Sequence, residues 1–205
     1  MLTLKNKLFL LFVYMSLFLS IFSITTNADE YKIDNEHSFI TFKIRHFNAG
    51  YVLGRFNIFS GNITFGEKIE SSSTNVSINS LSIDTGVAKR DFHLRTAEFL
   101  DILKFPEITF KSNKIVAGKD NRHFLITGKL KIKNMEKDIT IKAKQLGKSI
   151  DPYGQVRVAF KGTTTLNRFD YNINFDGKLK DGNPMIGSKI YTLIFIEAIK
   201  VGGVR

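Results

Sequence analysis

The residues best suited to chemistry lie in the segment 90–112, which reads RDFHLRTAEFLDILKFPEITFKS. Its start places Arg90, Asp91 and His93 among apolar neighbours. Such a mixture suits a site that binds the polar head group of a ligand with an apolar body. The same pattern also fits ordinary amphipathic packing, so these residues alone leave both interpretations open.

A catalytic site has weaker support. His37 beside Ser38 suggests a hydrolase pair, but adjacent residues of a strand point to opposite faces. The sequence has no Gly-x-Ser-x-Gly, no phosphate-binding glycine loop and no HExxH. The four histidines, with His46, His93 and His123 besides His37, are too scattered in sequence to form a metal set. We therefore expect no catalytic residue, no metal and no cofactor.

Alternation with a period of two dominates the rest of the chain and predicts β-strands. Between Ile40 and His46 the apolar residues are even-numbered, so His46 shares their inward face. The predicted strands are 40–46, 55–65, 74–83, 108–116, 123–133, 138–146, 156–166 and 189–201. The connecting turns are short, so neighbouring strands should pair antiparallel. The apolar face changes parity within 55–65 and 74–83, where we expect β-bulges.

The segment 84–104 interrupts this alternation. Phe92, Phe99 and Leu103 recur at roughly helical spacing, which predicts a short helix or two that covers one end of the sheet before Pro106. Eight long twisted strands can close into a barrel that holds one small ligand. The predicted fold is all-β with a short helical insert: an extended, eight-stranded antiparallel β-barrel.

Residues 1–28 have the layout of a secretory signal peptide, with two lysines before an uncharged apolar run at 8–24 and small or polar residues up to Ala28. We expect cleavage after Ala28 and one exported domain over 29–205, although the long apolar run also fits an uncleaved anchor. The sequence contains no Cys, which excludes disulfides and thiol nucleophiles.

The chain is basic, with a net charge of +11. This charge attracts phosphates or an anionic membrane surface. Lysines such as Lys129, Lys131 and Lys142 alternate with apolar residues, however, which places them on solvated strand faces rather than in one groove. We therefore expect no nucleic-acid partner, whereas transient membrane contact stays open.

Three blocks of the chain carry a family pattern. The first, residues 31–64, contains Asp34, His37, Ser38, Arg45, His46, Gly54 and Phe56, and the second is the segment 90–112. The third, residues 166–173, has Asn172 where a Gly is usual, and Asn tolerates a positive φ. Through these blocks the chain, from Tyr31 to about Val201, resembles the YceI-like family of exported lipid-binding barrels.

The resemblance implies a lipocalin-like barrel in the periplasm that holds an isoprenoid or another long-chain lipid by equilibrium binding. The residues expected to contact the head group are His46, Arg90, Asp91 and His93. Strand parity and the aromatic insert give the expected lining of the tail: Ile40, Phe42, Ile44, Phe56, Ile58, Phe99, Leu100, Phe110 and Phe160.

Several alternatives remain at this point. Each lining residue is equally compatible with plain core packing, and Arg90 with a structural ion pair to Asp91 or Asp170. An enzyme acting on a lipid-like substrate would use His46, Asp91 and His93 as acid and base. A filled barrel would instead dock on a membrane or a protein partner through its basic exterior. A monomer and a homodimer are both compatible with the sequence.

Overall fold

The computed structural model describes residues 28–202, so the predicted signal segment lies, apart from Ala28, outside the described residues. The strands are β1 Asp29–Ile33, β2 Phe39–His46, β3 Gly50–Phe56, β4 Phe59–Phe65, β5 Ser73–Asn79, β6 Ile83–Asp84, β7 Glu107–Ala117, β8 His123–Ile132, β9 Met135–Ile150, β10 Val156–Asn167 and β11 Ile186–Lys200. The α-helix is α2 Ala88–Arg95, and the 3-10 helices are η1 Asn35–His37, η2 Ile69–Ser71, η3 Ser80–Ser82 and η4 Arg168–Tyr171. In these residues no helix is long and apolar enough to cross a membrane.

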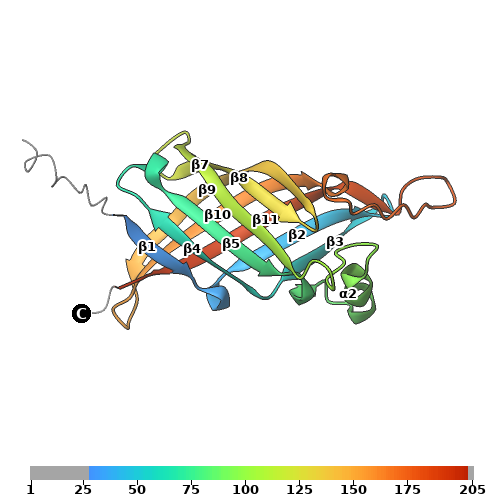
Figure 1. Cartoon of the computed structure of the whole chain (residues 1–205), viewed down its shortest axis with the longest axis horizontal. Coiled ribbons are helices and arrows are strands. Elements are labelled where there is room, and N and C mark those ends of the chain that lie inside the picture. Colours follow the sequence, from blue (N-terminus) through green and yellow to red (C-terminus); the bar gives the residue numbers. More distant parts are fainter. Residues whose placement is uncertain (1–27, 203–205) are drawn as a thin grey trace, which may run out of the picture.

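The strands form one closed antiparallel barrel in which sequence neighbours pair (Figure 1). Three long strands are each interrupted once, as β1 with β2, β3 with β4, and β5 with β6. Both halves of the first long strand lie against β11, and β1 also pairs with β4, which closes the ring. Counted in this way the barrel has eight long strands and one short α-helix. The predicted fold class is therefore confirmed.

The prediction of two β-bulges is wrong, because at each place one strand ends and another begins. Phe56 pairs with Ile40, whereas Phe59 pairs with Ile78 of a different strand, and Ile58 lies between the two ladders. In the second case η3 follows Asn79, whose side chain accepts a hydrogen bond from the Leu81 N–H. An interruption between two strands and a β-bulge both change which residues, odd-numbered or even-numbered, face the interior.

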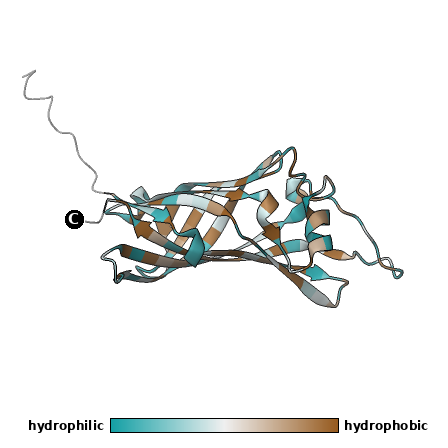
Figure 2. Ribbon diagram, turned by 90° about the horizontal axis from the view of Figure 1, so that it is seen from below, coloured by the Kyte–Doolittle hydropathy of each residue, from teal (hydrophilic) through white to brown (hydrophobic). Residues whose placement is uncertain are grey.

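Apolar and polar residues alternate along the strands (Figure 2), and the buried apolar residues form three clusters inside the barrel. Ile108, Phe110 and Ile132 are buried in the main cluster of core residues. Ile194 and Ile196 pack against the core clusters and are nevertheless only half-buried. Such incomplete burial of inward residues indicates a barrel that is not filled by its own side chains.

The insert after β6 forms one helix, α2, at one end of the barrel (Figure 1). Phe99 is buried, as its predicted packing requires. Phe92 and Leu103, which with Phe99 suggested helical spacing, are instead 72% and 95% exposed and do not share its buried face. The physical reason is that α2 ends at Arg95, so helical periodicity does not extend to residues 99 and 103.

Candidate functional site

Two cavities lie in series along the barrel axis. The deeper cavity has a volume of about 190 Å³, and the one at the α2 end has a volume of about 260 Å³. Ile108, Ile132 and Leu166 line both cavities, so the two spaces adjoin each other. Together they form an apolar tunnel, the kind of site that accommodates a long hydrocarbon chain.

Eight of the nine predicted tail-lining residues line this tunnel. Ile40, Phe110 and Phe160 line the deeper cavity, and Phe42, Ile44, Phe56, Phe99 and Leu100 line the cavity at the α2 end. The prediction for Ile58 is wrong: this residue is 59% exposed and lines neither cavity. It lies in the break between β3 and β4, where the alternation on which the prediction rested stops.

Polar side chains gather at the α2 end of the tunnel. His46, Arg90 and His93, from the predicted head-group set, all line the outer cavity. The His93 ring lies edge-on to Phe99, with the ring centroids 5.0 Å apart, and its Nε2 contacts the Glu98 carboxylate. Arg90 Nε donates to the Thr85 hydroxyl at 2.7 Å. The sequence therefore places three of its four head-group candidates around one opening.

Asp91 behaves differently from its neighbours. It is buried, and its Oδ1 accepts hydrogen bonds from the backbone N–H and the hydroxyl of Thr85, at 2.9 and 2.6 Å. It does not line the outer cavity. Among residues 28–202, Arg90 forms no ion pair with Asp91 or Asp170. An enzyme would need His46, Asp91 and His93 together as acid and base. His46 and His93 line the outer cavity but Asp91 does not, so the three are not assembled around the tunnel.

Arg168 is a functional candidate that the sequence interpretation missed. In the sequence, nearby Asp170 suggests that Arg168 forms a structural ion pair at this turn. In the structure, however, Arg168 Nη1 donates to the Ile173 carbonyl at 2.6 Å and its Nε donates to the Gly187 carbonyl at 3.0 Å. The residue is 2% exposed, lines the outer cavity, and has its pKa lowered by burial. Strand parity offered a signal, because Arg168 continues the inward positions of β10 two residues after Leu166.

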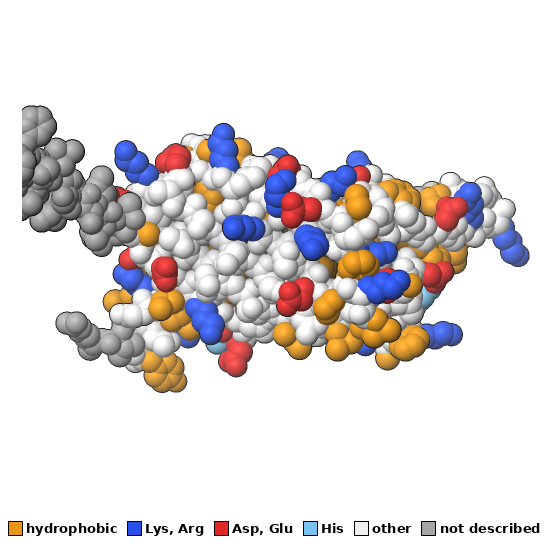
Figure 3. All heavy atoms as spheres, in the orientation of Figure 1, with side chains coloured by type: hydrophobic (Ala, Val, Ile, Leu, Met, Phe, Trp, Pro, Cys, Tyr) orange, Lys and Arg blue, Asp and Glu red, His pale blue; other side chains and the backbone are white. Residues whose placement is uncertain are grey.

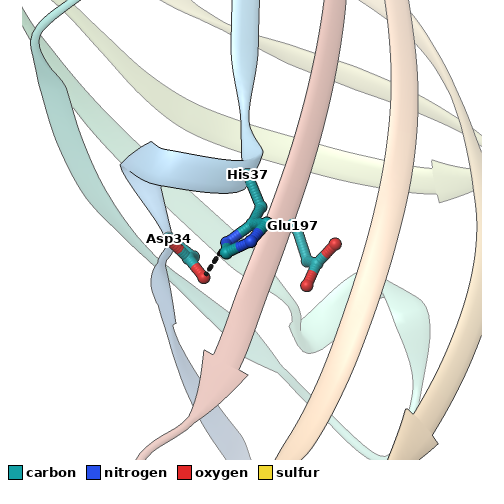
Figure 4. A group of neighbouring side chains, drawn as sticks. All are labelled: Asp34, His37 and Glu197. Atoms are coloured by element: carbon teal, nitrogen blue, oxygen red, sulfur yellow. Dashed lines mark hydrogen bonds and ion pairs between the residues drawn. The ribbon is translucent and has the colours of Figure 1, made fainter. Parts of the chain in front are cut away.

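A second polar cluster joins η1, β10 and β11. Asp34, His37 and Glu197 approach one another as metal ligands do, with His37 Nδ1 2.9 Å from Asp34 Oδ2 (Figure 4). Arg157 Nη1, however, donates to Asp34 and Glu197 at 2.7 Å, and its Nε donates to Asp151 at 2.7 Å. A metal ion at this cluster would have to displace a guanidinium that already neutralises the carboxylates. The cluster is therefore best described as an ion-pair network that ties three elements together.

Comparisons with known proteins agree with this architecture. The sequence model of the YceI-like domain matches residues 31–198. A UPF0312 protein of Pseudomonas paraeruginosa is 44% identical over 152 residues, which cover 73% of this chain and 78% of that protein.

Two solved structures share the fold. The Campylobacter jejuni YCEI protein superposes with a TM-score of 0.65 at 26% identity, over 76% of this chain and 88% of its own. A polyisoprenoid binding domain from Saccharophagus degradans superposes with a TM-score of 0.62 at 14% identity, over 83% of this chain and 98% of its own. On the extent of the matched sequence and the shared barrel, this chain belongs to the YceI-like domain family.

Proposed function

We propose that the protein binds a long-chain isoprenoid or a similar amphiphilic lipid in its tunnel, in the periplasm, and stores or carries it without chemical change. One observation supports this proposal most directly: the lining of the tunnel is mostly apolar, and its two imidazoles and two guanidinium groups, His46, His93, Arg90 and Arg168, all belong to the cavity at the α2 end. An amphiphile fits this arrangement with its tail inside and its head group near α2.

The energetics favour such a ligand. Transfer of apolar surface from water into the tunnel contributes about 25 cal/mol per Å². Arg90 and Arg168 carry donors suited to a phosphate or carbonyl oxygen, and His46 and His93 provide further polar contacts. The Saccharophagus degradans neighbour is described as a polyisoprenoid binding domain, which supports a ligand of this class. Binding without chemistry accounts for this site. Asp91, the carboxylate that the enzyme alternative requires, accepts hydrogen bonds from Thr85 instead of lining the cavity.

Native mass spectrometry of the protein purified from the periplasm of its own cells tests the proposal. The expected result is a protein–lipid complex whose ligand, after extraction, contains a long hydrocarbon chain. Protein that arrives free of ligand and also fails to bind added isoprenoids would overturn the proposal.

A further inference from the structure

One side of the barrel carries basic and apolar side chains without an acidic residue. We define the basic wall as the outward-facing residues of 39–45, 51–55, 142–144, 161–165 and 189–195. These five strands are neighbours in the order β9, β10, β11, β2 and β3. None of the outward positions is Asp or Glu. Asp84, beside β3, and Glu197, beyond the end of the β11 segment, lie at its borders.

Strand register shows that these side chains form one surface. Directly paired residues of neighbouring strands lie on the same face of a sheet. One row across the wall joins Lys144, Lys161, Phe195 and Phe39. The inward neighbour Phe160 lines the tunnel, which places this row on the outside.

A second row crosses the wall nearer the α2 end of the barrel. It joins Thr165, Tyr191, Lys43 and Leu53. The basic and apolar side chains of the two rows therefore belong to one continuous surface.

Six of the seven basic residues of the wall lack an acidic partner among the described residues. Among residues 28–202, the wall residues that form no ion pair are Lys43, Arg45, Lys142, Lys144, Lys161 and Lys189. Arg55 contacts Asp84 at 3.4 Å. Lys144 and Lys161 are paired directly across two strands, an arrangement of like charges that costs stability.

The remainder of the barrel surface is organised differently. On β8 and β9, Lys129 lies between Glu136 and Asp138, at 3.8 and 3.3 Å. The side of the barrel seen in Figure 3, over β4, β5 and β7, carries basic and acidic side chains close together among uncharged ones. A wall whose outward positions include no acidic side chain is therefore a local property rather than a general consequence of the basic composition.

Exposed apolar side chains lie between these cations. Leu53 is 67% exposed, and Tyr51, Tyr191 and Phe39 are also exposed. Lys43 Nζ lies 5.0 Å from the centre of the Tyr51 ring and 5.6 Å from that of Tyr191. Tyrosine rings among lysines suit the boundary between lipid head groups and acyl chains, and each Lys or Arg there is attracted to anionic lipid.

We propose that the basic wall docks the protein on the surface of an anionic lipid bilayer. Charge complementarity selects this occupant over a second copy of the chain, because a two-fold interface through the same patch would place cations against cations. Docking through the wall does not depend on the content of the tunnel. It can therefore fail or succeed independently of the proposed lipid ligand.

Vesicle flotation with the purified protein tests this inference. We expect binding to vesicles of phosphatidylcholine mixed with phosphatidylglycerol, little binding to pure phosphatidylcholine, and loss of binding at high salt. The double variant K43E and K161E should reduce binding at least about tenfold. The control pair K111E and K114E makes the same change in net charge on β7, outside the wall, and should reduce binding less than about twofold.

Four further measurements make the outcome decisive. The neutral pair K43Q and K161Q provides a second test if the glutamate variant unfolds, and thermal unfolding of each variant monitors this. The inference would be overturned if the wall variant and the β7 variant lost vesicle binding equally. It would also be overturned if the folded wild type did not bind anionic vesicles. Wild-type binding to single-stranded DNA but not to anionic vesicles would overturn it in favour of nucleic acid. Ligand content measured in the same variants should not change, which separates docking from the proposed lipid binding.

Discussion

Asp91 and Thr85 are joined by two hydrogen bonds, since the backbone N–H and the hydroxyl of Thr85 both donate to Asp91 Oδ1. Arg90 completes the arrangement by donating from Nε to the Thr85 hydroxyl and from Nη2 to the Thr85 carbonyl. The start of α2 is thereby anchored to the residue that follows β6. The most chemically suggestive part of the sequence therefore includes a structural anchor beside the mouth of the tunnel.

Removal of the Asp91 carboxylate should loosen this anchor. In Asp91→Ala the half-buried Thr85 donors lose their acceptor, which should lower the free energy of unfolding by about 1–3 kcal/mol. Urea unfolding of the purified variant measures this loss. Glu98→Ala, which removes an exposed carboxylate three residues after α2, should change stability by less than about 0.5 kcal/mol. Equal losses for the two variants would show that the Thr85 contacts contribute nothing specific.

A charge placed inside the tunnel should expel an apolar ligand. Phe42 lines the outer cavity, so Phe42→Asp should reduce the amount of copurifying lipid at least about tenfold, because a carboxylate beside the tail loses its hydration. Native mass spectrometry of the folded protein gives the ratio of bound lipid to protein. Ile58→Asp adds the same charge at an exposed site and should leave the ratio unchanged. Unchanged lipid in the Phe42 variant would show that this side chain does not contact the tail.

The Arg157 network should make stability depend on acid pH. The hydrogen bond from Arg157 lowers the pKa of Asp151 below its ordinary value. At Asp34, burial alone would raise the pKa, but the hydrogen bonds from Arg157 and His37 outweigh burial and lower it. A lowered folded-state pKa stabilises the protein above the unfolded-state pKa of about 3.9, and this contribution disappears as the pH falls through the folded-state values.

Arg157→Gln should therefore unfold at lower urea concentration than the wild type at pH 7, and the difference should shrink below about pH 4, where the carboxylates become protonated. Urea unfolding across this pH range checks both statements. Arg122→Gln replaces an exposed arginine that forms no ion pair among residues 28–202, and it should show no such pH-dependent difference. A difference that stays constant with pH would contradict the role of the carboxylates.

Asn172 holds a left-handed backbone conformation, with φ +54° and ψ +33°, as its place in the third sequence block led us to expect. Asn172→Gly should keep stability within about 0.5 kcal/mol, whereas Asn172→Val should lower it by about 1–3 kcal/mol, because a β-branched residue is strained there. Thermal or urea unfolding of both variants measures the contrast. Equal stability of the two would mean that the turn relaxes to another conformation.

The barrel was predictable from sequence because each long strand has one face toward an apolar interior and the other toward water, which imposes a period of two. The same rule located Phe42, Phe110 and Phe160 on the lining. It failed at Ile58, because a change of parity does not reveal whether a strand bulges or ends. Only the pairing of Phe56 and Phe59 with different strands distinguishes these cases.

The polar end of the site was less predictable. His46 followed from the parity of its strand, but the contacts of Asp91 depend on how the loop at Thr85 folds back, which no periodicity encodes. Arg168 was interpreted as half of an ion pair, since nearby Asp170 offered an obvious partner. The carbonyls that Arg168 binds instead come from a turn and a distant strand, so tertiary structure alone reveals them.

The chemical difference between the two ends of the tunnel gives a bound molecule a direction. For the proposed ligand, the head group rests near Arg168 while the hydrocarbon extends toward Phe160, so every occupied copy presents the same atoms outward. The end beside His46 is therefore where a receiving protein or membrane would meet the head group first.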